Sequence, residues 1–226
     1  MKVQLVGKRL INSLWVFSFM LFVIVCNIQI KAQPMPKAIY STGEAAEDLV
    51  DYAQAANWGK IKLKIGEINN FYNSYRSEVI HNKLSLQLLD FYSHYVEVLN
   101  KNLSLKQADR IAFAANQITG IGVDFENHFS HKIPPAVSRL DYLGREILLE
   151  AKANNSIAVN RRLGDIDEIW TVLKPVVVAK HGVKQAAEFE RLVSKIKSLK
   201  GKLNSVEFRQ TVNKYSDQID RLEKLF

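Results

Sequence analysis

The chain is poor in cysteine. Cys26 is the only cysteine among 226 residues, which excludes a disulfide within the chain, a Cys-rich zinc site and a Cys-x-x-Cys-His haem attachment. It lies inside an apolar N-terminal segment, and the bulky run Val23-Ile24-Val25 before it argues against a lipid-attachment signal. If that segment is removed, about 190 residues remain, enough to form a core that is held by packing alone.

Sequence motifs of the common enzyme classes are also missing. The chain has no Gly-x-Ser-x-Gly nucleophile turn, no glycine-rich phosphate loop, no dinucleotide-binding fingerprint and no His-Glu-x-x-His zinc helix. Catalytic groups can still assemble from distant positions. The sequence therefore favours a non-catalytic protein without settling the question of enzymatic activity.

Residues 1–32 have the pattern of a signal peptide. Lys2, Lys8 and Arg9 precede an almost unbroken apolar run that closes at Ala32. A basic segment, an apolar segment and a small residue in this order predict export, with cleavage after Ala32. The alternative is an uncleaved anchor, since Leu10 to Ile30 is long enough to cross a bilayer as a helix. Either way we expect the body to face the periplasm or another envelope compartment.

The positive net charge comes partly from this segment. Residues 1–32 contain four cations and no acid, so their removal lowers the net charge from +8 to +4. The densest basic stretch, from Lys195 to Lys202, has the pattern of the solvated face of an amphipathic helix. We therefore expect no nucleic-acid partner, and contact with a membrane only through residues 1–32 if they stay attached.

The hydrophobic period after residue 33 is helical, and strand signals are scarce. Apolar residues recur at three- and four-residue steps through most of the chain, with breaks at Asn57, at Pro134-Pro135 and near Gly201. Ser41 with Glu44, and Ser104 with Gln107, have capping-box spacing and predict helix starts. We expect a linker over 33–42 and a single all-α domain over 43–226, an antiparallel bundle of about six helices.

The best metal candidate is Asp124-x-Glu-Asn-His128-x-x-His131. On a continuous helix, side chains spaced by four and then three residues share one face. Two imidazoles with a carboxylate suit a transition metal ion, although a closed site needs a fourth ligand. The competing interpretation is that the two histidines meet the negative end of the helix dipole.

The segment 139–146 is the most polar part of an otherwise apolar helix. Arg139, Tyr142, Arg145 and Glu146 could line a pocket for a polar or anionic ligand between helices. The alternative is a row of exposed ion pairs, each worth about 0.5 kcal/mol or less. Gly144 favours a close contact at this point, because a mid-helix glycine costs about 1 kcal/mol relative to alanine.

A group of aromatic residues falls at the first helical hairpin: Phe71, Tyr72, Tyr75, Phe91, Tyr92 and Tyr95. We expect these rings to pack against one another, while Phe91 and Phe71 lie off the apolar stripe and could form a surface for a partner. The sequence thus predicts an exported, non-catalytic binding or interaction module of the cell envelope, whose partner is an envelope protein or a small ligand. The alternative is a metal-binding bundle with a redox or metal-delivery role.

Overall fold

The helical pattern predicted from the sequence is present throughout the part of the chain described by the computed structural model, residues 33–226. The predicted signal peptide or anchor, residues 1–32, lies outside the described residues. No helix within 33–226 has both the length and the apolar character needed to span a membrane.

Eight helices form the described part of the chain, so the prediction of an all-α fold is confirmed, with more helices than the six expected. They are α2 (Lys37–Gln54), α3 (Trp58–His81), α4 (Leu86–Ser104), α5 (Ala108–Glu126), α6 (Pro135–Lys152), α7 (Ser156–Ala179), α8 (Val183–Ser198) and α9 (Val206–Glu223). The long apolar pattern before residue 80 is two helices, because the chain turns at Asn57. Pro175 does not end α7, which continues to Ala179.

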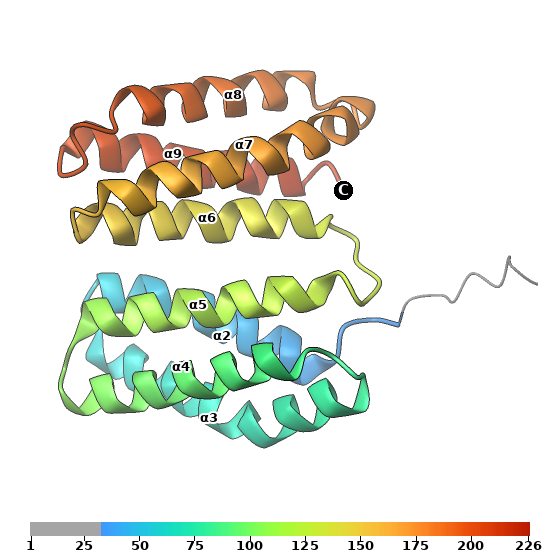
Figure 1. The fold of residues 1–226 in the computed structure, drawn as a ribbon, viewed down its shortest axis with the longest axis vertical. Helices are drawn as coiled ribbons and strands as arrows, with labels where there is room; N and C mark the ends of the chain where they lie inside the picture. Colours follow the sequence, from blue (N-terminus) through green and yellow to red (C-terminus); the bar gives the residue numbers. More distant parts are fainter. Residues whose placement is uncertain (1–32) are drawn as a thin grey trace, which may run out of the picture. The chain divides into compact units, whose positions relative to one another are not determined.

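The helices are arranged as two four-helix halves within one compact unit (Figure 1). In the N-terminal half, α2 to α5, each helix packs against its neighbour in the chain, and α2 also packs against α5. The C-terminal half, α6 to α9, repeats this arrangement, with α6 against α9. Adjacent antiparallel helices with short loops give this up-and-down order. The halves meet mainly where α5 packs against α6.

Each half has its own apolar core. Tyr75 and Tyr92 stack at 3.8 Å between ring centroids in the N-terminal core, beside Phe125. Trp170, Phe189 and Tyr215 pack ring on ring in the C-terminal core. The packing expected for the rings of the first hairpin is thus observed for Tyr72, Tyr75 and Tyr92, whereas Tyr95 packs against Phe113 of α5. The two buried clusters are separate, although Leu149 of α6 packs against the N-terminal cluster and Tyr142 of the C-terminal cluster packs against Gly120 of α5.

Five of the short loops share one backbone design. After the last helical residue, one residue adopts a left-handed conformation and the next donates its N–H to the carbonyl five residues back, as in the Schellman motif. The left-handed positions are Ala56, Lys83, Lys106, Asn154 and His181. At the fifth loop the left-handed residue is therefore His181, and Gly182 follows it. A Cβ on Gly182 would lie 2.5 Å from Leu225, so a side chain has no room there.

The two predicted capping boxes do not start helices. The helix α2 begins at Lys37, inside the segment predicted as a linker, with Pro36 as its N-cap. The helix α4 runs through Ser104, and α5 begins only after Gln107, whose side chain makes no cap hydrogen bond. Ser41 lies inside a helix that has already begun, so it cannot cap a helix start. Ser104 is the last residue of α4, and the loop that follows it delays the start of α5 to Ala108.

The basic stretch from Lys195 is paired with acids. Lys195 Nζ lies 2.5 Å from Glu207, and Lys197 Nζ lies 2.5 Å from Asp167. Both pairs are exposed, as expected for the solvated face of α8 and the turn that follows it.

Candidate functional site

The contact between the halves is formed by two unusually buried helices, α5 and α6. Most of α5 is buried around its whole circumference, because α2 and α4 pack on it from one half and α6 from the other. Small residues such as Ala115 and Gly120 permit this close packing. Polar side chains of both helices, among them Asn116 and Glu146, are buried in this contact. The interface between the halves therefore contains buried polar groups beside its apolar contacts.

A groove runs along one side of this contact, lined by α4, α5 and α6. It consists of two cavities of about 540 Å³ and 260 Å³, which share Tyr95 in their walls. The larger cavity lies near the start of α5 and the smaller one near its end. The lining includes Phe91, His94, Tyr95 and Val98 from α4, Phe113, Gln117 and Asp124 from α5, and Arg139, Tyr142 and Leu149 from α6. Cavities of this total size are in the range that holds small organic ligands.

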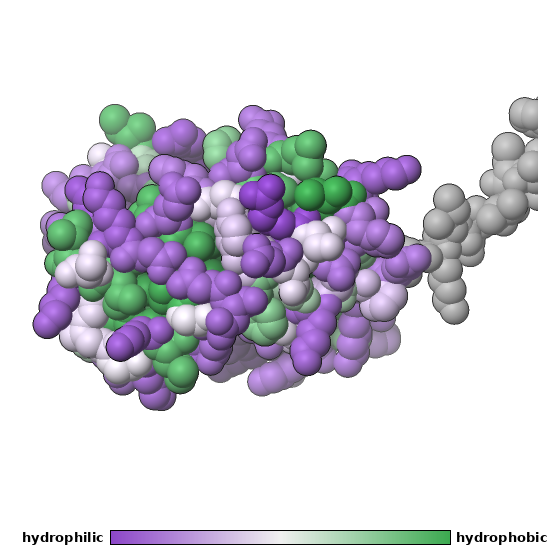
Figure 2. Space-filling model, turned by 90° about the horizontal axis from the view of Figure 1, so that it is seen from below, coloured by the Kyte–Doolittle hydropathy of each residue, from purple (hydrophilic) through white to green (hydrophobic). Residues whose placement is uncertain are grey.

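Two aromatic rings of the groove are open to solvent. Phe91 is 47% exposed and Phe113 is 39% exposed. The ring centroids of Phe113 and Tyr95 are 6.5 Å apart in an edge-to-face arrangement. Seen from the side of α3 and α4, apolar side chains gather in separate areas between polar ones (Figure 2). The sequence pattern left open whether Phe91 packs against the other rings or lies at the surface. In the structure it lies at the surface.

The floor of the groove is closed by Tyr142. Its ring lies against α5 at Gly120, where a Cβ would be only 2.8 Å from the ring. The Arg139 guanidinium lies 5.3 Å from the ring centroid and is paired with Asp124 of α5. The Tyr142 hydroxyl donates a hydrogen bond of 3.3 Å to Glu146. Burial, and then the Glu146 charge, raise the pKa of the Tyr142 hydroxyl.

Glu146 is a fully buried carboxyl group behind this floor. Its Oε1 accepts hydrogen bonds from the Gln117 side-chain amide and from Tyr142, whereas its Oε2 is buried with no hydrogen-bond partner among the described residues. Burial raises the pKa of Glu146, and the positive charge of Arg162 on α7 partly opposes this shift. A buried carboxyl with a free acceptor is a group whose charge the fold tolerates poorly.

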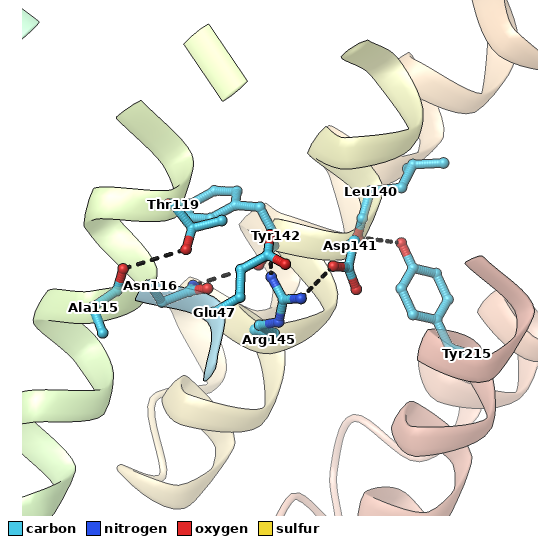
Figure 3. A network of polar contacts seen from close by, with 9 residues as sticks. All are labelled: Glu47, Ala115, Asn116, Thr119, Leu140, Asp141, Tyr142, Arg145 and Tyr215. Atoms are coloured by element: carbon cyan, nitrogen blue, oxygen red, sulfur yellow. Dashed lines mark hydrogen bonds and ion pairs between the residues drawn. The ribbon is translucent and has the colours of Figure 1, made fainter. Parts of the chain in front are cut away.

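On the opposite side of α6, Arg145 connects the two halves (Figure 3). Its guanidinium lies 2.5 Å from Asp141, one turn earlier on α6, and 3.3 Å from Glu47 on α2. The predicted i, i+4 pairing of Asp141 and Arg145 is present, and both side chains are largely buried. We call these three residues, Glu47, Asp141 and Arg145, the clasp.

The clasp carries more negative than positive charge. Glu47, Glu223 and Asp220 all act on Asp141, and only Arg145 opposes them. Burial, followed by these neighbouring carboxylates, raises the pKa of Asp141 to about 7. The pKa of Glu223 is also raised, chiefly by burial. A cavity of about 260 Å³ beside the clasp is lined by Glu47, Asp141 and Glu223, so these groups can exchange protons with solvent.

The structure places the four residues predicted to line a pocket on two different sides of α6. Arg139, Tyr142 and Glu146 lie on the side of the groove, where Arg139 and Tyr142 form part of its wall. Arg145 belongs to the clasp. They are not a row of exposed surface pairs. Gly144 marks a close helix contact, as its position predicted, although the contact is with Tyr215 of α9 rather than with a ligand.

The three residues predicted as metal ligands are not brought together. Helix α5 ends at Glu126, two residues before His128, so the assumption of a continuous helix through His131 is wrong. Asp124 is paired with Arg139, both histidines are exposed, and Nδ1 of His131 lies 3.1 Å from the Phe129 carbonyl oxygen. Within residues 33–226, no three His, Cys, Asp or Glu side chains are grouped in a way that could hold a metal ion.

Several residues of this region were not identified from the sequence. Gln117 and Glu47 are each one of several polar residues on their helices, and their partners lie 29 and 98 positions away along the chain. The only local signal is a glutamine in the middle of the most apolar helix. Tyr95 belonged to the aromatic group, but nothing local indicated that it would face α6.

Comparison with known proteins gives no relative: the chain matches no protein-family model, no curated protein and no solved structure.

Proposed function

We propose that this protein is an exported, non-catalytic binding module of the cell envelope, and that the groove between α4, α5 and α6 takes a small, mainly apolar ligand. Export rests on the signal-peptide pattern of residues 1–32. The absence of the common catalytic motifs from the sequence supports a binding role.

The observation that carries the proposal is the aromatic lining of the groove. Tyr95 separates two adjoining cavities, and Phe91 and Phe113 expose their rings beside it. Single exposed apolar residues are common on protein surfaces, but these two rings border a concave site, and ligand sites are typically apolar with a few fixed polar groups.

Two acidic residues near the groove are paired with cations, whereas Arg110 and Glu150, which also line the larger cavity, form no ion pair among residues 33–226. Asp124 is neutralised by Arg139 at one end, and Asp109 by Lys152 at the other, where the two charged atoms are 2.5 Å apart. Charges that are already paired attract an ionic ligand weakly. Hydrogen bonding is available from the Gln117 side chain in the middle. The ligand we expect is therefore an elongated apolar or aromatic molecule with one polar group.

Titration with the fluorescent probe anilinonaphthalene sulfonate tests this proposal. We expect saturable binding to the wild type, weakened about tenfold by Phe113→Glu, which places a charge in the groove; a tenfold change corresponds to about 1.4 kcal/mol. Val172→Glu is the matched control, because Val172 is 75% exposed on α7, away from the groove. Binding that is not saturable, or that both variants weaken equally, would contradict the proposal and direct the search to a protein partner.

A further inference from the structure

We propose that the clasp is a proton-operated latch between the two halves: protonation of Asp141 holds α2 against α6, and loss of that proton lets the halves separate on this side. The inference is independent of the ligand proposed for the groove. It starts from the observation that the halves have separate buried cores and that polar as well as apolar side chains are buried in the contact between them. Contacts of this kind open at lower free energy than a shared core does.

The latch follows from which half supplies each charge. Glu47 belongs to the N-terminal half, whereas Asp141 and Arg145 belong to the C-terminal half. When Asp141 is neutral, the Arg145 charge is available to Glu47, and the ion pair ties the two halves together. When Asp141 is ionised, it lies 2.5 Å from Arg145 and competes for that charge, and it also repels Glu47 across the interface. Loss of this one proton thus weakens the net attraction between the two halves at this point.

The carboxyl groups that face Asp141 from the neighbouring helices all disfavour its ionised form. Helix α9 contributes Glu223, Asp220 and Tyr215. Burial, and then the charge of Asp141, raise the pKa of the Tyr215 hydroxyl. From α5, Glu126 lines the same cavity, and burial raises its pKa as well. From α2, Asp51 adds a further carboxyl group beside Arg145. On α7, Arg162 acts on Glu146 and Tyr142 on the groove side.

The backbone on both sides of Asp141 is held by hydrogen bonds from neighbouring helices. The Tyr215 hydroxyl donates a 2.9 Å hydrogen bond to the carbonyl of Leu140, the preceding residue, and holds this turn of α6 against α9 (Figure 3). On the other face, the Asn116 side chain donates to the carbonyl of Tyr142 at 3.4 Å. The Glu47–Arg145 pair is therefore the contact that a charge change at Asp141 weakens, because α2 packs extensively on α5 but not on α6.

Distance measurement between spin labels on the outer helices tests the latch. Asn70 on α3 and Ser194 on α8 are exposed and are changed to cysteine, in a chain whose one native cysteine is removed by Cys26→Ser. We expect one narrow distance distribution at pH 5.5 and an added, longer component at pH 8.5, with the change centred near pH 7. Asp141→Asn, which mimics the protonated form, should keep the narrow distribution at both pH values.

Two further variants complete the test. Lys152→Gln removes an exposed ion pair that also joins the halves, and it should respond to pH as the wild type does. Glu47→Gln removes the cross-interface repulsion at a half-exposed position, so it serves if Asp141→Asn fails to fold, and it should show a smaller pH response than the wild type. The latch is wrong if the wild-type distribution is the same at both pH values, or if Asp141→Asn and Glu47→Gln respond as strongly as the wild type.

Discussion

The ring of Tyr215 on α9 occupies the space into which a side chain on Gly144 of α6 would extend. A Cβ at Gly144 would lie 2.8 Å from Cε1 of Tyr215. Tyr215 is fully buried, and its hydroxyl is bonded to the Leu140 carbonyl, so the ring cannot turn aside without losing that bond. Contact between α6 and α9, and with it the closure of the C-terminal half, therefore depends on this glycine.

This contact predicts opposite effects for two glycine-to-alanine changes. Gly144→Ala should lower the free energy of unfolding by about 1–2 kcal/mol, because overpacking against Tyr215 outweighs the gain in helix propensity. Gly164→Ala, at an exposed position in α7 with no atom within 4 Å of its Cβ, should raise the free energy of unfolding by up to about 1 kcal/mol. Urea denaturation of both variants checks the pair. Equal effects would mean that Tyr215 is free to move.

The loop between α2 and α3 gives a second prediction. Ala56 has a φ of 50°, a left-handed conformation that is strained for a residue with a Cβ. Ala56→Gly should stabilise the protein by about 0.5–1 kcal/mol, after the greater freedom of glycine in the unfolded chain is taken into account. Asn154→Gly, at the equivalent position before α7, should gain less, since asparagine tolerates this conformation. Thermal unfolding of the two variants distinguishes them, and a loss of stability in Ala56→Gly would contradict the prediction.

The helical class was predictable from the sequence because each helix needs only one apolar face. The same fact explains why the division into two halves was not. The apolar face of α7 could be buried equally well in one large bundle or in one of two small bundles. The sequence of this face does not indicate which helices pack against it. The exception is α5, whose apolar residues and small residues surround the whole helix. Such a helix has neighbours on every side, and this pattern was the available sign that two bundles share it.

The candidate site was predictable only in part, for a related reason. Polar residues in an apolar helix pointed to α6, and the spacing predicted the Asp141–Arg145 pair within it. The partners on other helices, Gln117 for Glu146 and Glu47 for Arg145, depend on the packing. The metal prediction failed on a helix end. The turn after Phe125, where the His128 N–H bonds to the Phe125 carbonyl, rotates the following residues away from the face of Asp124. Spacing alone does not show where a helix stops.

The mass of the protein recovered from its own envelope fraction is a third prediction. Cleavage of a signal peptide after Ala32 leaves a chain that begins at Gln33. We expect that mass, measured on intact protein, and no protein that retains residues 1–32. A mass that includes those residues would instead support the uncleaved anchor, in which case the protein should also fractionate with the membrane.

The buried carboxyl of Glu146 gives a fourth prediction, which concerns pH. Because burial raises its pKa in the folded protein, the native state holds this proton to higher pH than the unfolded chain does. The stability that the carboxyl contributes is therefore present below its ordinary pKa and is lost as the pH rises through the raised value. Glu146→Gln removes this loss. The stability of Glu146→Gln relative to the wild type, measured by urea denaturation, should increase between pH 4 and pH 7.

Glu190 on α8 provides the opposite case and serves as the control. Its Oε1 accepts hydrogen bonds from Lys174 at 2.5 Å and from the Trp170 indole at 3.0 Å, and these bonds lower the pKa of Glu190. Its stabilisation is therefore present above the pKa of the unfolded chain and is lost as the pH falls through the lowered folded value. Glu190→Gln should lose stability relative to the wild type at pH 7 and lose less at pH 4. Because the trends for Glu146→Gln and Glu190→Gln have opposite signs, a general effect of neutralising an acid cannot produce both. Parallel trends in the two variants would show that burial does not control the proton on Glu146.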